Sequence, residues 1–173
     1  MIERFLELLV QATAQIPAHY FQLPAAGGGE TIYRERVYTY ELYHQLRTLL
    51  QTEHRLARYA LSGEIDKRGH PIIRPCAPDL VFHHPGQMDN LVVVEVKPVN
   101  GTSRGTRKDL TNLAYFTSPN VHYQIGVELV YGDDERAFSR FKRRFRELDP
   151  QRFKLLWHRR IGEPAAFENI SPA

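Results

Sequence analysis

The sequence contains very little cysteine and no long apolar run. Cys76 is the only cysteine among 173 residues, so an intrachain disulfide and a cysteine-rich zinc site are both excluded, and a reducing cytoplasm is the expected location. No apolar stretch approaches the roughly 20 residues that a membrane-spanning helix needs, so we expect no membrane partner. The N-terminal MIERFLELLV carries acids among its apolar residues, which is not typical of a signal peptide.

Acidic residues are scarce near the C-terminal end. Residues 136–160 contain ten Lys and Arg against two Asp and Glu, a local charge of +8 in a chain whose net charge is +3. Such an uneven distribution favours a face that binds a polyanion. A solvated helix face would explain the same residues without any ligand.

The spacing of apolar residues predicts helices and strands in an alternating order. A length of 173 residues suits one domain, so we expect residues 1–173 to form a single α/β domain. Antiparallel strands followed by alternating helix and strand indicate a mixed sheet flanked by helices. The expected helices cover 2–16, 36–52, 106–117 and 134–148, and the expected strands cover 59–66, 78–84, 91–97, 121–132 and 153–161.

One strand, LVVVEVK, is strongly apolar and yet carries two charges. Side chains alternate along a strand, so Glu95 and Lys97 share one face, roughly 6.6 Å apart. Burying an unpaired charge costs several kcal/mol, so the two residues must lie at a sheet end, form a pair or bind an ion. A structural salt bridge would explain Glu95 and Lys97, but it would not require the nearby Asp79.

Asp79 begins the preceding strand. If PGQMDN closes a hairpin, Asp79 and Glu95 lie near corresponding ends of strands about 4.8 Å apart. Two carboxylates can share a hard cation, and Mg²⁺ favours one or two carboxylates, a carbonyl oxygen and water. We therefore predict a Mg²⁺ site at Asp79 and Glu95, with the carbonyl of Val96 as a further ligand and Mn²⁺ as a substitute.

Lys97 would stand beside this cation. A lysine near cations and away from water loses its proton more readily. It would then orient or deprotonate the attacking water, or stabilise charge on a phosphate. The cation would lower the pKa of the water and polarise the phosphoryl oxygen.

Pro78-Asp79, fifteen intervening residues and Glu95-Val96-Lys97 resemble the signature of the PD-(D/E)XK nuclease superfamily. Many members also carry a glutamate on a helix before the core sheet, and Glu41 occupies the matching place. The family core is a helix, a three-strand meander, a helix and a strand, which is the order expected for residues 36–131. The glutamine-tyrosine motif of the exonuclease-like branch is not found in its usual place, so no subfamily is assigned.

The resemblance implies a restriction endonuclease-like fold, a three-layer α/β/α arrangement with a central mixed sheet. It also implies metal-dependent hydrolysis of phosphodiester bonds, in which Asp79, Glu95, Lys97 and Glu41 would be catalytic and Glu41 would bind the metal or its water. We favour DNA and endonucleolytic cleavage, while RNA and exonucleolytic cleavage stay open. A non-catalytic nucleic-acid-binding module on the same fold is the alternative, and a structural protein with only a salt bridge is a third.

Several basic residues are candidates for phosphate contacts. A helix N-terminus with basic side chains binds phosphate well, although ordinary surface charge explains these residues equally. A homodimer or a protein partner is compatible with the sequence. The candidate nucleic-acid-binding residues are Arg104, Arg107, Lys108, Arg140, Arg143 and Arg144.

Other polar and aromatic residues are more typical of structural roles. Glu64 and Asp66 lie two apart on one strand face and could add a second-metal ligand, but we favour pairing with a neighbouring arginine. The adjacent His83 and His84 point to opposite faces of a strand, which is poor chelation geometry. Cys76 is expected to be a packing residue. Tyr38, Tyr40 and Tyr43 are interpreted as core and groove residues rather than as a platform for stacking bases.

Overall fold

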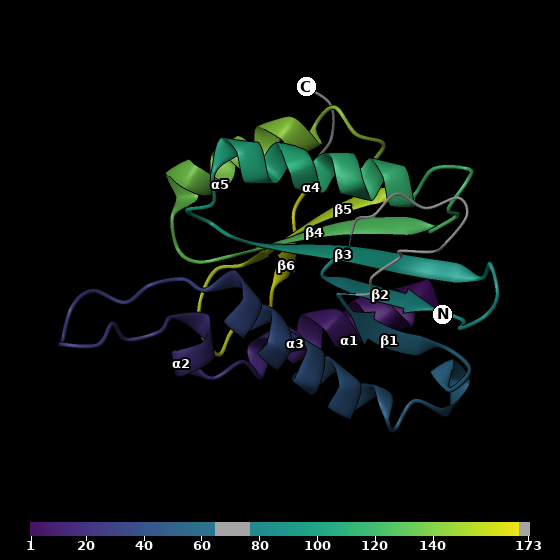
Figure 1. The fold of residues 1–173 in the computed structure, drawn as a ribbon, viewed down its shortest axis with the longest axis horizontal. Helices are drawn as coiled ribbons and strands as arrows, with labels where there is room; N and C mark the ends of the chain where they lie inside the picture. The colour runs from purple at the N-terminus through teal and green to yellow at the C-terminus, as the bar shows by residue number, and fades with distance from the viewer. Residues whose placement is uncertain (65–76, 170–173) are drawn as a thin grey trace.

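The computed structural model describes residues 1–64 and 77–169, and Figure 1 shows their arrangement. Three α-helices and a 3-10 helix come first, three consecutive strands follow, and helices and strands then alternate up to the last two strands. The helices are α1 (Ile2–Ala14), α2 (Ala18–Phe21), α3 (Glu35–Leu50), the 3-10 helix η1 (His54–Leu56), α4 (Ser103–Phe116) and α5 (Glu135–Phe145). The strands are β1 (Ala60–Gly63), β2 (Leu80–His83), β3 (Asn90–Pro98), β4 (Ile125–Tyr131), β5 (Phe153–His158) and β6 (Ala166–Phe167).

The described strands form one mixed sheet in the order β1-β2-β3-β4-β5-β6. The pairs β1–β2, β2–β3 and β5–β6 are antiparallel, whereas β3, β4 and β5 run parallel. Helices α4 and α5 cover one face, and α1 and α3 cover the other (Figure 1). The predicted mixed α/β architecture, with a central mixed sheet between helices, is therefore confirmed.

The alternation of side chains along β3 separates two apolar clusters. Val92, Val94 and Val96 pack on the face covered by α1 and α3. Val93 packs on the opposite face with the aromatic side chains of α4 and α5. Glu95 and Lys97 have the parity of Val93, so they share one face of the strand, as the sequence predicted, and this face is the one toward the layer that contains α4.

The predicted elements agree with the observed ones to within a few residues at most ends. The strand expected over 121–132 starts later, at Ile125, and the helix expected over 106–117 starts earlier, at Ser103. The sequence did not predict α2, η1 and β6, which are too short to show a repeating apolar pattern. Residues 65–76, which include Asp66 and Cys76, lie outside the described residues.

Within the described ranges 1–64 and 77–169, no helix is both long enough and apolar enough to cross a membrane.

Gly132 follows β4 and should not tolerate a side chain. Its φ is +116°, and a Cβ there would lie 2.7 Å from Val99 Cγ1 and 2.9 Å from the Tyr33 ring. We predict that Gly132→Ala lowers the free energy of unfolding by about 2–4 kcal/mol, since backbone strain and overpacking add. Urea denaturation measures this loss.

Gly86→Ala is the matched control. Gly86 also has a positive φ, +75°, but no atom lies within 4 Å of the added Cβ. Its cost should be only about 1–2 kcal/mol. Equal losses in the two variants would show that the contacts around Gly132 do not matter.

Candidate functional site

Asp79 and Glu95 lie opposite each other on neighbouring strands. Leu80 pairs with Val94 in the antiparallel register of β2 and β3, so the next pair outward is Asp79 and Glu95. The Asp79 Oδ2 accepts a hydrogen bond of 2.7 Å from the backbone N–H of Val96. The hairpin therefore brings these two carboxylates together as the sequence predicted, and it fixes one of them to the backbone of the other strand.

Lys97 lies between two helices from opposite layers. Its Nζ is 2.8 Å from Glu35 Oε2, at the start of α3, and 3.1 Å from Asp109 Oδ2, on α4. The first turn of α4 lies close by, because a Cβ placed on Gly105 would be 4.0 Å from Lys97 Nζ. The C-terminal end of β3 is thus where residues of α3 and α4 meet.

Helix α4 contacts both charged residues of β3. Asn112 Nδ2 donates a hydrogen bond of 3.1 Å to Glu95 Oε1, while Asp109, one turn earlier, pairs with Lys97. Residues three apart lie on one face of a helix. One face of α4 therefore orients Glu95 and Lys97 together.

A further carboxylate, Glu128, is fully buried beside Glu95. The two residues are partners in the parallel register of β3 and β4, so their side chains share a face of the sheet. Glu128 has no exposed surface, and neither of its carboxylate oxygens has a hydrogen-bond partner among the described residues. A buried carboxylate without a partner is costly, which marks this position for a functional explanation.

The four acids of the sheet and of α4 hold their protons more tightly than usual. Burial raises the pKa of Asp79 to about 6, and the Glu35 and Asp109 carboxylates add to this rise. Burial is also the largest cause of the raised pKa of Glu95, Asp109 and Glu128. The cluster contains more carboxylates than nearby positive charges, so each carboxylate disfavours ionisation of the others.

The surroundings of Lys97 contradict the expectation that this residue loses its proton readily. Burial alone would lower its pKa, but the hydrogen bond to Glu35 and the charge of Asp109 outweigh burial, so the pKa of Lys97 rises. The side chain is therefore held as an ammonium ion. A role in stabilising negative charge fits these contacts better than a role as a base.

The donor set has the chemistry that a hard divalent cation requires. It consists of carboxylate oxygens and a nearby backbone carbonyl, and it has an excess of negative charge. However, the described residues contain no group of three or more His, Cys, Asp or Glu side chains arranged to hold a metal ion as they stand. Asp79 and Glu95 would have to complete their coordination with Val96 carbonyl oxygen, water or substrate.

Glu41 is not one of the side chains that gather around Lys97. Its Oε1 accepts a hydrogen bond of 2.6 Å from Gln45 Nε2, one turn later on α3. Glu35 contacts Lys97 instead. Six residues correspond to about 240° around a helix, so Glu35 and Glu41 point in different directions. Glu35, rather than Glu41, is therefore the glutamate of α3 that contacts Lys97.

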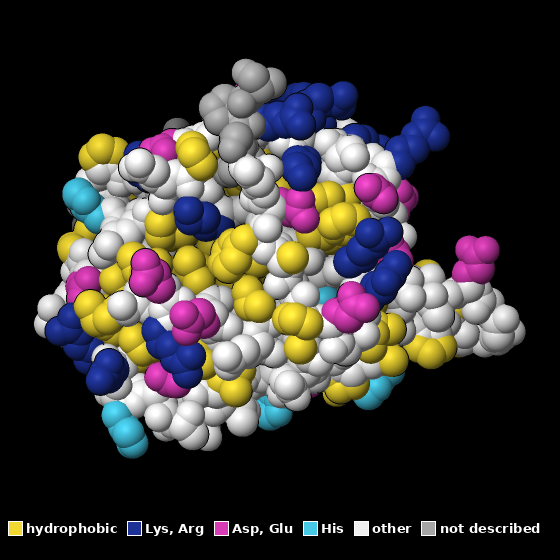
Figure 2. Space-filling model, turned by 180° about the vertical axis from the view of Figure 1, so that it is seen from behind, with side chains coloured by type: hydrophobic (Ala, Val, Ile, Leu, Met, Phe, Trp, Pro, Cys, Tyr) yellow, Lys and Arg dark blue, Asp and Glu magenta, His cyan; other side chains and the backbone are white. Residues whose placement is uncertain are grey.

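The predicted basic residues lie on α4 and α5, two helices on the same face of the sheet, and we call them the basic surface. Arg104, Arg107 and Lys108 are exposed on the first turns of α4, and Arg140 and Arg143 are exposed on α5. Arg144 Nη1 donates to the Ser103 carbonyl at 3.3 Å, which joins the two helices. Figure 2 shows Lys and Arg side chains gathered on the side of the molecule where α4 and α5 lie.

The structural interpretations of Glu64, His83 and His84 agree with their contacts. Glu64 pairs with Arg36 at 3.2 Å. His83 Nε2 lies 3.4 Å from Ser62 Oγ, and the His84 ring lies edge-on to Tyr59. None of these contacts involves the residues around Lys97.

Sequence reasoning missed Glu35, Asp109, Asn112 and Glu128. Glu128 carried a usable signal, because IGVELVY is as apolar as LVVVEVK and also contains one acid. Asp109 and Asn112 form a polar pair three apart on the helix that follows β3. Glu35 fell one residue outside the expected helix over 36–52.

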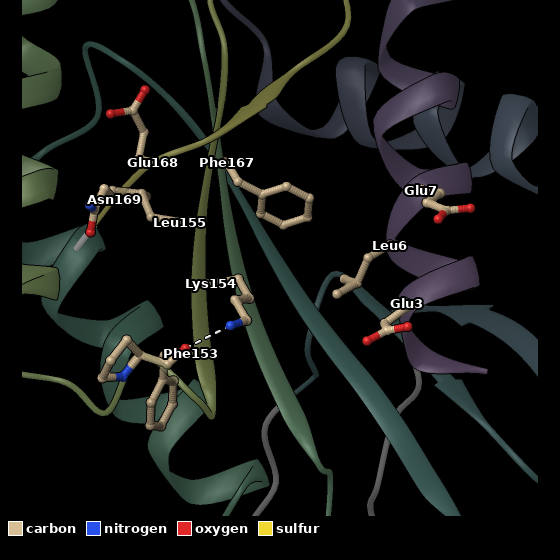
Figure 3. Close-up of a pocket in the computed structure, with 10 residues that line it drawn as sticks. Glu3, Leu6, Glu7, Phe153, Lys154, Leu155, Phe167, Glu168 and Asn169 are labelled. Atoms are coloured by element: carbon tan, nitrogen blue, oxygen red, sulfur yellow. Dashed lines mark hydrogen bonds between the residues drawn. The ribbon is translucent and has the colours of Figure 1, made fainter. Parts of the chain in front are cut away.

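A separate hollow of about 520 Å³ lies at the other edge of the sheet, between α1 and the strands β5 and β6 (Figure 3). Leu6, Leu155 and Phe167 provide apolar surface, and Glu3 and Glu7 also line it. None of the predicted site residues lines this hollow. Its size alone therefore does not make it a better candidate than the end of β3.

Comparison of the chain with protein-family models, curated proteins and solved structures gives no match. The functional interpretation therefore depends on the residues and contacts described above.

The acid cluster predicts a pH-dependent stability. The folded protein binds the Asp79 proton more tightly than the unfolded chain, whose pKa is near 3.8. The free energy of unfolding should thus fall as the pH rises through about 6. We predict that Asp79→Asn raises it by about 1–3 kcal/mol at pH 8 and leaves it unchanged near pH 3.5, measured by urea denaturation in EDTA.

Glu147→Gln provides the control, because Glu147 is an exposed acid remote from this cluster in the chain. It should leave the stability at both pH values nearly unchanged. If Asp79→Asn were no more stable than the unmodified protein at pH 8, the buried, ionised Asp79 carboxylate would not destabilise the folded state.

Proposed function

We propose that the protein is a Mg²⁺-dependent nuclease that hydrolyses phosphodiester bonds, with DNA as the favoured substrate and endonucleolytic cleavage as the favoured mode. The observation that carries this proposal is the convergence of Asp79, Glu95 and Lys97 at one end of β3. A simple salt bridge would require one acid beside Lys97. The surplus of buried carboxylates is better explained by a cation that completes the charge balance.

Asp79 and Glu95 are the residues that would hold Mg²⁺ or Mn²⁺, together with the Val96 carbonyl. A cation bound there would lower the pKa of a bound water and polarise a phosphoryl oxygen. Asn112 keeps the Glu95 carboxylate oriented, and the Val96 N–H does the same for Asp79. The Glu128 carboxyl lies behind Glu95 with unpartnered oxygens, so a cation bound at Glu95 would favour its ionised form.

Lys97 would act as a fixed ammonium ion. Glu35 and Asp109 hold its Nζ from opposite layers, so its position is set before any substrate binds. In that position it can donate hydrogen bonds to a phosphate oxygen or to the attacking water. Its function in this proposal is to stabilise charge that develops on the phosphate.

The basic surface on α4 and α5 would bind the nucleic-acid backbone. Its α4 part adjoins the site, because the first turn of α4 lies beside Lys97. Its α5 part continues outward through the contact between Arg144 and Ser103. A strand that follows this surface would therefore lead its phosphates to the end of β3.

We also propose a restriction endonuclease-like topology for the core. The order helix, three antiparallel strands, helix and strand, which that family implies, matches α3, β1, β2, β3, α4 and β4. The cytoplasmic location and a homodimer or other protein partner stay predictions from the sequence.

A non-catalytic nucleic-acid-binding module on this fold is the second candidate. It is favoured by the two ion pairs that already neutralise Lys97, and by the finding that the described side chains form no ready group of three metal ligands. Such a module would bind nucleic acid through the basic surface and would not cleave it.

Cleavage assays with supercoiled plasmid, linear duplex, single-stranded DNA and RNA separate the two candidates. We predict cleavage with Mg²⁺ or Mn²⁺ and none with EDTA. Asp79→Asn, Glu95→Gln and Lys97→Ala should each reduce the rate by about 100-fold or more, since each removes a group that acts on the reacting atoms.

Glu35→Gln and Glu41→Gln form a matched pair on the same helix. Glu35→Gln should slow cleavage clearly because it releases Lys97. Glu41→Gln should change the rate by less than about threefold, as a substitution away from Lys97 would. Binding without cleavage of any substrate would favour the module. Cleavage that survives Lys97→Ala would contradict the proposed site.

The basic surface predicts a defined salt dependence of duplex binding. Each phosphate contact contributes about 0.9 to the slope of log affinity against log salt concentration. We predict that Arg140→Ala and Arg143→Ala each reduce this slope by about 0.9, measured by fluorescence anisotropy in EDTA. The control is Arg55→Ala, at an exposed arginine of η1, which should leave the slope unchanged. Equal slopes in all variants would show that α5 makes no phosphate contacts.

A further inference from the structure

A hollow of about 320 Å³ adjoins the candidate site on the side of α3 and β1. We call it the Tyr40 hollow. Asp79 is one of its lining residues, so the hollow opens directly beside the proposed metal ligands. Its other walls come from Thr39, Tyr40 and Tyr43 of α3, and from Gly63, Glu64 and Leu80.

Helix α3 connects the Tyr40 hollow to Lys97. Glu35, Thr39 and Tyr43 are spaced four residues apart, so they follow one another along the same side of the helix. Glu35 holds Lys97, and Thr39 and Tyr43 line the hollow. One helical step of four residues is about 6 Å, so the hollow begins close to the Lys97 ammonium.

The tyrosines on and beside this part of α3 differ in exposure. Tyr43 is half-buried, and its hydroxyl lies 3.4 Å from the Leu61 carbonyl and 3.5 Å from Arg47. Tyr40 is 56% exposed, although the sequence suggested a core or groove role for it. Tyr38, by contrast, is fully buried. Packing therefore explains Tyr38 and part of Tyr43, but it does not explain the exposed ring of Tyr40 beside the site.

Gly63 keeps the opposite wall of the hollow free of a side chain. A Cβ on Gly63 would lie 3.5 Å from the Asp79 carbonyl oxygen and 3.7 Å from the Tyr43 ring. These are ordinary contact distances, so alanine would fit there, whereas a branched side chain would extend into the hollow. The described residues thus leave a space bordered by tyrosine rings next to the buried acids.

We infer that the Tyr40 hollow receives an unpaired nucleobase of the strand whose phosphate lies at Asp79, Glu95 and Lys97. This inference rests on the proposed nuclease function and specifies its substrate class: single-stranded or locally unpaired DNA. An exposed tyrosine stacks on any base whose face is free, whereas both faces of a base inside a duplex are occupied by its neighbours. The carboxylate of Glu64, which also lines the hollow, can accept a hydrogen bond from the amino group of a base.

Binding of short oligonucleotides in EDTA tests the inference without depending on cleavage. We expect the protein to bind single-stranded DNA more tightly than duplex of the same sequence. Tyr40→Ala should weaken single-strand binding by about tenfold, and Tyr40→Phe should retain it, because the ring rather than the hydroxyl stacks. Gly63→Leu, which fills the hollow from the other wall, should produce a similar loss.

Phe167→Ala is the matched control, since Phe167 is also an exposed aromatic residue, 48% accessible, but lies on β6 beside the separate hollow in Figure 3. It should bind like the unmodified protein. A 2-aminopurine base in the single strand should lose fluorescence on binding, and Tyr40→Ala should restore it.

Two results would overturn the inference. Unchanged single-strand binding in both Tyr40→Ala and Gly63→Leu would exclude the hollow as a base site while leaving the nuclease proposal intact. Tighter binding of duplex than of single strand would reject the substrate class. If the unmodified protein bound no nucleic acid at all and cleaved none, the proposed function itself would fail, and the inference with it.

Discussion

The burial of several carboxylates around one ammonium ion is the constraint on which the site depends. Asp79, Glu95, Asp109 and Glu128 all have a raised pKa, chiefly because they are removed from water. The ammonium group of Lys97 lies beside them and pairs with Asp109. A fold that only needed stability would replace such acids with apolar residues. Their retention at a single sheet end is the physical reason for proposing a cation there, and it implies that the protein gives up stability at neutral pH for this arrangement.

Each secondary-structure element around this cluster positions a different charged residue. The hairpin of β2 and β3 sets Asp79 opposite Glu95, α4 orients Glu95 through Asn112, and α3 holds Lys97 through Glu35. The basic surface lies on the α4 and α5 side, and the Tyr40 hollow lies on the α3 and β1 side. A nucleic-acid strand at the end of β3 would therefore meet its phosphate contacts on one helical layer and its base contacts on the other.

The sequence predicted the parts of this site that local geometry determines. Asp79 and Glu95 could be paired because a short turn joins their strands, and Lys97 could be placed because strands alternate. Glu35, Asp109 and Glu128 could not be placed in the same way, because their approach depends on how α3, α4 and β4 pack against β3. The choice of Glu41 depended on the resemblance alone; the rotation of α3 turns that residue toward Gln45 and brings Glu35 to Lys97.

Isothermal titration calorimetry of the purified protein with Mn²⁺ tests the central claim most directly. The carboxylate cluster predicts one saturable Mn²⁺ site, from which Mg²⁺ displaces Mn²⁺. The double variant Asp79→Asn, Glu95→Gln should bind Mn²⁺ about 100-fold more weakly, since both proposed ligands lose their charge. Glu41→Gln should bind as the unmodified protein does. Equal Mn²⁺ affinity in the double variant, or no saturable binding by the unmodified protein, would contradict a metal site at the end of β3.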